Sequence, residues 1–276
     1  MPLDSPQHFG WVGLGAMGWP MCLQLLKNSS ATSLWIFDVD ESVLHRFATE
    51  APEGKEVRIA TDAKQVADES DLIFTIVPEG RQACQRGIII FMCGIAADDE
   101  KFSVIYAILK TMGKSINPMG GRGLGLAAKL SNNYLSGIIA LATSEAMNLG
   151  MKLGIDPKVL SDCLAQGSAS NWVNSTVNPV PGVCPDAVTS KGYEGGFKVQ
   201  LMEKDMKLAA KAAQNVGAKL ILGQTAIDAY ASAASDSRYR GKDSRVVYKW
   251  LVGETPRDRS CLTRRKAVHS SSWYRS

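Results

Sequence analysis

The chain has 276 residues, of which 45% are hydrophobic and 21% charged, and its formal net charge is +4. This length accommodates one large domain or two ordinary domains with sizeable cores. The excess charge is local, because six basic residues and one acidic residue fall between Pro256 and Ser276. The composition therefore gives no reason to expect a nucleic-acid-binding protein.

Several other classes are disfavoured. No run reaches the roughly 18 apolar residues of a membrane span, so we expect no membrane partner. The three histidines show no metal-ligand spacing, and the six cysteines are scattered without a C-x-x-C pair. This cysteine usage is typical of reduced, intracellular proteins. With no recognisable leader before the first apolar run, we expect a cytoplasmic protein, with the mitochondrial matrix as the alternative.

Short apolar runs alternate with helical patterns in the first part of the chain, which is typical of a parallel sheet covered on both faces. We expect strands at 9–13, 33–38, 57–60, 71–77, 87–92 and 114–117. The remainder reads as helices, at 123–149, from Asp156-Pro157 onward, at 197–216 and at 218–235. We therefore predict an α/β Rossmann-type domain over 8–122, an all-α domain over 123–253 joined through the long helix, and a basic, disordered tail over 254–276.

A glycine-rich loop follows the first expected strand and opens a helix. It is the G-x-G-x-x-G fingerprint of dinucleotide binding, with the sequence Gly13-Leu14-Gly15-Ala16-Met17-Gly18. The first glycine permits a tight turn, the second lets the pyrophosphate approach the backbone, and the third lets the helix pack closely on the strand. A purely structural glycine turn is the alternative to these cofactor-binding roles.

Asp38 ends the second expected strand, twenty residues after the last glycine of the fingerprint. A carboxylate there can accept hydrogen bonds from both ribose hydroxyls of NAD and would repel the 2′-phosphate of NADP. The next residues are Val39 and Asp40, with no arginine among them. NAD is therefore the expected cofactor, and a solvated strand-end acid is the alternative reading of Asp38.

Lys129 is the candidate catalytic residue. It lies on the long predicted helix among largely apolar neighbours, and Asn133 follows four residues later on the same face. Oxidation of an alcohol needs a base for the hydroxyl proton, and a lysine whose pKa is lowered by desolvation can serve. Asn133 could then orient the hydroxyl. A lysine on a solvated helix face is the alternative.

The chain resembles the β-hydroxyacid dehydrogenase family, and within it the 3-hydroxyisobutyrate dehydrogenases. The similarity rests on the glycine loop, on the Lys129–Asn133 helix, and on residues 143–150 (TSEAMNLG), 178–183 (NPVPGV), 193–197 (YEGGF) and 201–206 (LMEKDM). It implies NAD-dependent oxidation of 3-hydroxyisobutyrate to methylmalonate semialdehyde in valine breakdown, with Lys129 as the catalytic lysine and Asn133 on the substrate. It also implies that Lys204, Val77 and Pro78 border the cofactor, and that the protein is a homodimer or homotetramer.

One departure from the family pattern follows Pro78. The family continues there through a strand, a helix and a second strand that carry a substrate-binding segment, whereas only residues 79–86 stand in this chain before the next similar strand. We therefore expect a truncated sheet and weak or absent substrate binding. The alternatives are a reductase of another small semialdehyde, such as glyoxylate or succinic semialdehyde, or a dinucleotide-binding protein without efficient catalysis.

Overall fold

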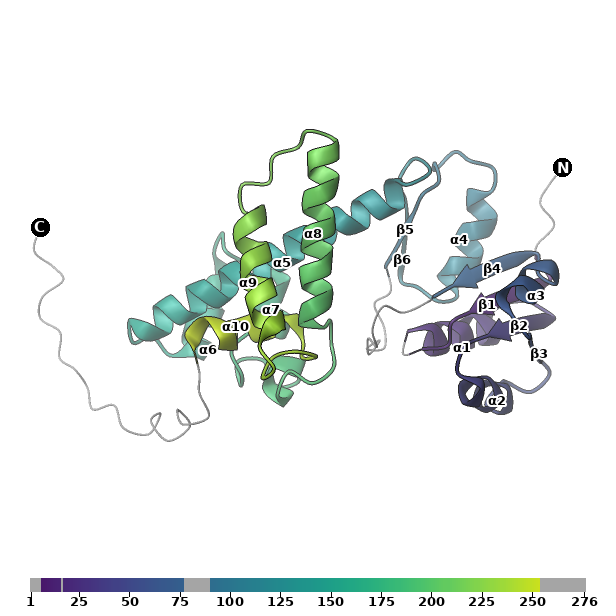
Figure 1. The fold of residues 1–276 in the computed structure, drawn as a ribbon, viewed down its shortest axis with the longest axis horizontal. Coiled ribbons are helices and arrows are strands. Elements are labelled where there is room, and N and C mark those ends of the chain that lie inside the picture. Colours follow the sequence, from purple (N-terminus) through teal and green to yellow (C-terminus); the bar gives the residue numbers. More distant parts are fainter. Residues whose placement is uncertain (1–5, 16, 77–89, 254–276) are drawn as a thin grey trace, which may run out of the picture.

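The computed structural model describes residues 6–15, 17–76 and 90–253. An α/β unit precedes an all-helical unit, and the long helix α5 links the two (Figure 1). The predicted fold class is thereby confirmed. The exact division at residues 122 and 123 stays a prediction, and the expected tail lies outside the described residues.

The first sheet has four parallel strands in the order β3-β2-β1-β4. These strands are β1 (His8–Val12), β2 (Ser33–Phe37), β3 (Glu56–Ile59) and β4 (Leu72–Thr75). The connecting helices are α1 (Gly18–Asn28), α2 (Glu41–Thr49) and α3 (Ala63–Asp68). Side chains of β2 alternate between the two faces, so that Leu34 and Ile36 pack with α1 and α2 while Trp35 and Phe37 pack with Val66 of α3. This alternation buries both faces, as a parallel sheet requires.

A second, two-stranded parallel sheet follows, made of β5 (Ile90–Cys93) and β6 (Ser115–Pro118) around α4 (Phe102–Lys110). Within the described residues no hydrogen bonds join it to β4, so the expected single sheet is in two pieces. Both pieces still share one core, because Leu109 and Ile116 pack in the same cluster as Trp11. The described residues of this unit thus form two parallel sheets over one core, and the expected truncation stays a prediction.

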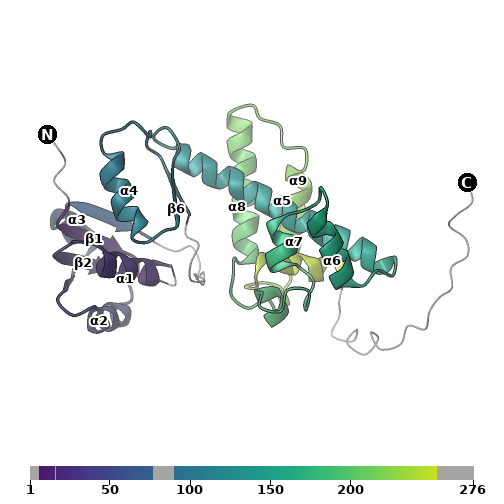
Figure 2. The ribbon, with the colours of Figure 1, turned by 180° about the vertical axis from the view of Figure 1, so that it is seen from behind.

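The helical unit is built around α5 (Leu124–Lys152), a helix of 29 residues that runs behind α8 and α9 in Figure 1 and behind α6 and α7 in Figure 2. The other helices are α6 (Pro157–Gln166), α7 (Trp172–Val177), α8 (Val199–Asn215), α9 (Gly223–Ser235) and α10 (Val247–Val252). Asp156 caps α6 as predicted, accepting hydrogen bonds from the Lys158 and Val159 amides. The helix expected from residue 218 begins only at Gly223, after a turn that carries the exposed Ile221.

Gly137 marks the centre of the helical core. A Cβ there would lie 2.9 Å from the sulfur atoms of Met202 and Met206 on α8, so glycine allows the two helices to approach closely. The fully buried Tyr230 of α9 donates a hydrogen bond of 2.8 Å to the Gly137 carbonyl oxygen. Burial also raises the pKa of the Tyr230 hydroxyl, which stays protonated. Within the described parts of the chain, no helix is long and apolar enough to span a bilayer.

We predict that Tyr230→Phe lowers the free energy of unfolding of the helical unit by about 1–3 kcal/mol, because the buried Gly137 carbonyl loses its side-chain donor. Urea denaturation followed by far-ultraviolet circular dichroism measures this change. Tyr106→Phe, at a tyrosine that is 41% exposed, is the matched control and should leave the unfolding midpoint unchanged. Equal midpoints for both variants would contradict the prediction.

Candidate functional site

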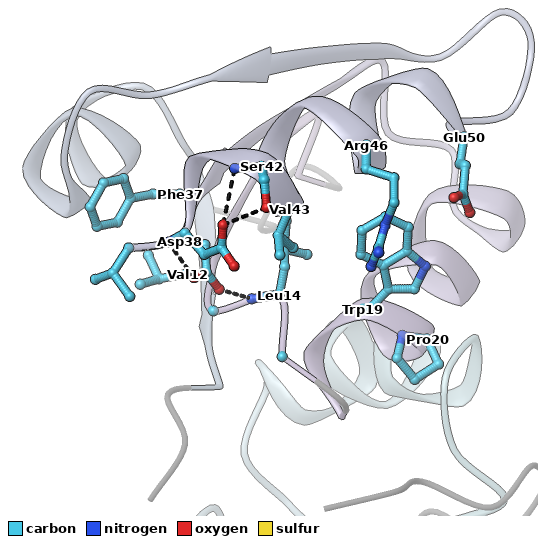
Figure 3. A pocket seen from close by; sticks show the side chains of 14 residues that line it. Val12, Leu14, Trp19, Pro20, Phe37, Asp38, Ser42, Val43, Arg46 and Glu50 are labelled. Carbon is cyan, nitrogen blue, oxygen red and sulfur yellow. Dashed lines mark hydrogen bonds between the residues drawn. The ribbon is translucent and has the colours of Figure 1, made fainter. Parts of the chain in front are cut away.

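The α/β unit has an open groove of about 1000 Å³ at the carboxyl ends of β1 and β2. Its walls come from the glycine loop, the start of α1, the end of β2 and the inner face of α2 (Figure 3). Ligands of open parallel sheets bind at this edge of the sheet, beyond the strand ends. The groove is therefore the expected place for the adenosine and pyrophosphate parts of a dinucleotide.

The glycine loop has the tight geometry that the fingerprint predicts. Gly13 has a φ of +97°, in the left-handed region that favours glycine. A Cβ on Gly18 would lie 1.9 Å from the Gly13 carbonyl oxygen, so only glycine permits α1 to start this close to β1. Met17 caps α1 without a side-chain hydrogen bond, which leaves the amino end of the helix able to receive a phosphate. Ala16 of the fingerprint lies outside the described residues.

Asp38 is fixed beneath the glycine loop by backbone amides. Its Oδ2 accepts a hydrogen bond of 2.6 Å from the Leu14 amide, and its Oδ1 accepts one of 3.0 Å from the Asp40 amide (Figure 3). These two bonds hold the carboxylate in one orientation at the floor of the groove. Each oxygen retains lone pairs for a further donor, such as a ribose hydroxyl.

The far wall of the groove carries a positively charged residue that we did not predict from the sequence. The Arg46 guanidinium of α2 lies over the Trp19 ring of α1, 4.4 Å from its centroid (Figure 3). Trp19 is held in turn by an edge contact with the buried ring of Phe47. Nearby, a hydrogen bond from the Ser42 hydroxyl lowers the pKa of Asp40, which caps α2. Asp40 is thus occupied at the helix end, and Asp38 is left as the acid at the groove floor.

A second group of polar side chains lies where α5 meets α8. The Asn133 amide nitrogen donates a hydrogen bond of 2.7 Å to Oδ2 of Asp205, whose side chain is nearly fully buried. The Lys204 ammonium lies 3.9 Å from the other oxygen of the same carboxylate. Lys129 is one helical turn before Asn133 on α5. Two residues proposed from the sequence, Asn133 and Lys204, therefore lie beside Asp205, which we did not identify from the sequence.

Several expectations about this site stay open. Lys129 is exposed in the described structure, and its catalytic role stays a prediction. In the described chain no residue of α5 or α8 lines the groove. Val77 and Pro78, predicted to border the cofactor, lie outside the described residues. No cluster of three potential metal ligands occurs in the described parts.

Known protein families match both halves of the chain. Residues 8–86 match a family model described as the NAD binding domain of 6-phosphogluconate dehydrogenase. Residues 123–251 match one described as NAD-binding of NADP-dependent 3-hydroxyisobutyrate dehydrogenase. A probable mitochondrial 3-hydroxyisobutyrate dehydrogenase of Dictyostelium discoideum is 30% identical over 91% of this chain and 92% of its own length. The chain belongs to the β-hydroxyacid dehydrogenase family.

Other relatives agree with this assignment. A 3-hydroxyisobutyrate dehydrogenase of Pseudomonas aeruginosa is 38% identical over 75% of this chain and 68% of its own length. The solved 3-hydroxyisobutyrate dehydrogenase of Mycobacterium tuberculosis with L-serine shares the fold, with a TM-score of 0.70 at 23% identity over 89% of this chain and 99% of its own. As a family member the chain is an NAD(P)-dependent oxidoreductase.

We predict that Gly18→Ala weakens cofactor binding by roughly tenfold or more, about 1.4 kcal/mol, because the added methyl group would collide with the Gly13 carbonyl and displace the loop. Titration calorimetry with NAD measures the affinity. Gly167→Ala, where the nearest atom to the new Cβ is 3.9 Å away, is the control and should bind NAD as the unsubstituted chain does. Unchanged affinity in the Gly18 variant would refute the role given to the close approach.

Proposed function

We propose that this β-hydroxyacid dehydrogenase binds NAD, rather than NADP, in the groove between α1 and α2. The observation that carries this proposal is the Asp38 carboxylate, which two backbone amides hold at the groove floor. A carboxylate fixed there accepts both hydroxyls of the adenosine ribose and repels a 2′-phosphate. The glycine loop and the amino end of α1 would hold the pyrophosphate.

We further propose that the chain oxidises 3-hydroxyisobutyrate to methylmalonate semialdehyde, a step of valine breakdown, as the names of its relatives suggest. Bound NAD supplies the hydride acceptor. Lys129 takes the proton of the substrate hydroxyl as the carbonyl forms, and it returns the proton in the reverse direction. Asp205 holds the Asn133 amide nitrogen, so the Asn133 carbonyl oxygen is oriented to accept a hydrogen bond from the substrate. Reduction of glyoxylate or succinic semialdehyde with NADPH is a weaker candidate, because Asp38 disfavours the phosphorylated cofactor.

A second candidate function, cofactor binding without efficient turnover, is favoured by the shortness of the chain. The alignment with the Dictyostelium protein runs over 307 positions, whereas 91% of 276 residues is about 251, so about 56 positions have no counterpart here. A lysine acts as a base only when neutral, and burial favours the neutral form. Lys129 is exposed in the described structure.

We also propose that the chain forms a homodimer or homotetramer and acts on a small hydroxyacid without a nucleic-acid or membrane partner. The sequence favours a cytoplasmic location. Several relatives are named mitochondrial, so the matrix is the second possibility. Localisation of the full chain by fluorescence microscopy would distinguish the two compartments.

For the cofactor, we predict that Asp38→Asn weakens NAD binding by roughly tenfold and improves binding of NADP relative to NAD, because the carboxylate charge is removed. Asp40→Asn is the matched control two residues away, and its amide can still cap α2. Calorimetric titration of each variant with both cofactors gives the four affinities. If the two substitutions change the NAD-to-NADP ratio equally, Asp38 does not select the cofactor.

For the reaction, we predict that Lys129→Ala lowers the rate of 3-hydroxyisobutyrate oxidation by roughly 100-fold or more, without changing NAD affinity. Lys211→Ala, at an exposed lysine of α8, is the control and should retain the full rate. The assay follows NADH absorbance with purified chain, alongside a form in which the residues absent after Pro78 are restored from the Pseudomonas relative.

These two forms separate the candidate functions. A rate above roughly one turnover per second in the unmodified chain supports the dehydrogenase and rejects the impaired candidate. NAD binding without turnover in the unmodified chain, with turnover in the restored form, supports the impaired candidate. Failure of both forms to oxidise 3-hydroxyisobutyrate would reject the proposed substrate.

A further inference from the structure

The string at residues 193–197 (YEGGF) carries part of the family resemblance but has no part in the proposed reaction. We call it the Tyr193 turn. Three of its residues have a left-handed backbone, with φ of +61° at Tyr193, +82° at Gly195 and +65° at Gly196. The Tyr193 ring is buried, and its hydroxyl donates a hydrogen bond of 2.5 Å to the Pro179 carbonyl oxygen. Because a tyrosine keeps this backbone conformation only where its surroundings hold it, the turn is a firmly built feature directly before α8.

A buried carboxylate lies at the centre of the Tyr193 turn. The Asp243 side chain is fully buried, and its Oδ2 accepts hydrogen bonds of 3.0 Å from the Phe197 amide and from Nη2 of Arg245. A Cβ on Gly196 would lie 2.0 Å from the same oxygen, so the turn closes around the carboxylate because glycine stands there. Burial raises the pKa of the Asp243 carboxyl, and the Arg245 guanidinium opposes that rise. The fold therefore encloses a charged group that burial alone would disfavour.

The chain contains the same tripeptide twice, and only one copy holds the turn. Residues 236–238 and 243–245 (both DSR) form the same local motif, in which the aspartate accepts a hydrogen bond from the arginine amide and pairs with the arginine side chain. The aspartate and arginine side chains of the first copy are 22% and 48% exposed, whereas those of the second are 0% and 14% exposed. The local sequence thus explains the ion pair but not its burial against the Tyr193 turn.

The segment around Asp243 also holds the beginning of α8. The Ser244 amide donates a hydrogen bond of 2.6 Å to the Phe197 carbonyl oxygen. The Val199 amide, at the first residue of α8, donates one of 2.8 Å to the Lys242 carbonyl oxygen. The backbone on both sides of the helix start is therefore bonded to residues 242–244.

The start of α8 sets where the polar groups of the active site lie. Lys204 and Asp205 are five and six residues after the first residue of the helix, about 8–9 Å along its axis. Asp205 accepts the hydrogen bond of 2.7 Å from Asn133 on α5. A slide of α8 by about 1 Å would take these atoms beyond hydrogen-bond distance, so the position of the helix start matters for the site.

Apolar packing alone does not set that position sharply. On its core side α8 presents Val199, Met202 and Met206. The hydrophobic effect is non-directional, and methionine side chains adapt to small shifts. A buried ion pair, in contrast, contributes little net stability and requires a well-defined geometry. The Asp243–Arg245 pair therefore has the properties of a group that fixes a position rather than one that supplies stability.

We propose that Asp243 is a positioning residue of the active site, which fixes the start of α8 and thereby places Lys204 and Asp205 against Asn133. Its effect on catalysis rests on the proposed function, whereas the placement itself can be measured without turnover. Asp243 acts through the Tyr193 turn and through α8, and not by contact with substrate or cofactor.

The first test measures the placement by nuclear magnetic resonance of the full chain labelled with ¹⁵N-asparagine. Asn133→Ala identifies the side-chain amide signal of Asn133 by its loss. We expect Gly196→Ala to move this signal toward that of an amide without a carboxylate partner, because the added methyl group displaces Asp243. Gly192→Ala is the matched control, since its φ of +72° carries similar backbone strain but no atom lies within 4 Å of the new Cβ. An unchanged signal in Gly196→Ala, or an equal change in both variants, overturns the proposal.

The second test separates position from stability. Asp243→Leu combined with Arg245→Met replaces the buried pair by apolar side chains of similar volume, a change that often preserves stability, but it removes the acceptor of the Phe197 amide. We expect the folded double variant to show the same movement of the Asn133 signal. Asp236→Leu combined with Arg238→Met, at the exposed copy of the motif, should leave the signal in place. A signal that stays in place in the buried double variant overturns the proposal, and so does a complete loss of folding, since the pair would then supply stability.

The effect on catalysis is measured in the form of the chain that oxidises 3-hydroxyisobutyrate, unmodified or restored. We expect kcat per folded chain to fall roughly 10- to 100-fold in the Asp243 double variant, with NAD affinity unchanged because other elements build the groove. The Asp236 double variant should retain the full kcat. Equal kcat values per folded chain in the two double variants overturn the positioning role. If neither form turns over, the proposed substrate fails, and the Asn133 signal alone decides the placement.

Discussion

The close approach of α5 to its neighbours is the constraint on which both units of the chain depend. A Cβ on Gly125 would lie 2.2 Å from the Met92 carbonyl oxygen of β5, and one on Gly137 would lie 2.9 Å from two methionine sulfurs of α8. Glycine within a helix costs about 0.5–1 kcal/mol relative to alanine. The packing that these contacts permit offsets that cost and places the Lys129 turn between the β5 sheet and the helical core.

Two buried or half-buried carboxylates then organise the polar groups that this framework brings near each other. Asp38 accepts the Leu14 amide across 24 residues of sequence, and Asp205 accepts the Asn133 amide across 72. A hydrogen bond to a charged group contributes about 1.5–3 kcal/mol, enough to fix a side chain in one orientation before a ligand arrives. Each carboxylate is therefore held in a position that the fold has already set.

The parts of the site predicted from sequence were those whose chemistry is local in the chain. The fingerprint of Gly13 to Gly18 and the acid at the end of β2 follow from spacing, because a strand, a turn and a helix fix their relative positions. Asp205 lay within a recognised string but was missed, since its partner Asn133 is reached only through the packing of α8 on α5. The exposure of Lys129 could not be predicted from the sequence for a related reason. Apolar neighbours along one helix do not reveal which of its faces another element covers.

The division of the sheet separates the groove proposed to bind the cofactor from the residues of α5 proposed to act on the substrate. The adenosine groove is built entirely from β1, α1, β2 and α2, all of which the chain retains. The strands at the break are poorly covered for a parallel sheet, with Ile73 of β4 38% exposed and Ile90 of β5 53% exposed. In the sequence, the residues after β4 stand between the groove and the Asn133–Asp205 pair. Cofactor recognition therefore rests on a local unit, whereas the proposed hydride and proton transfer require the groove and the Lys129 turn of α5 to be brought together.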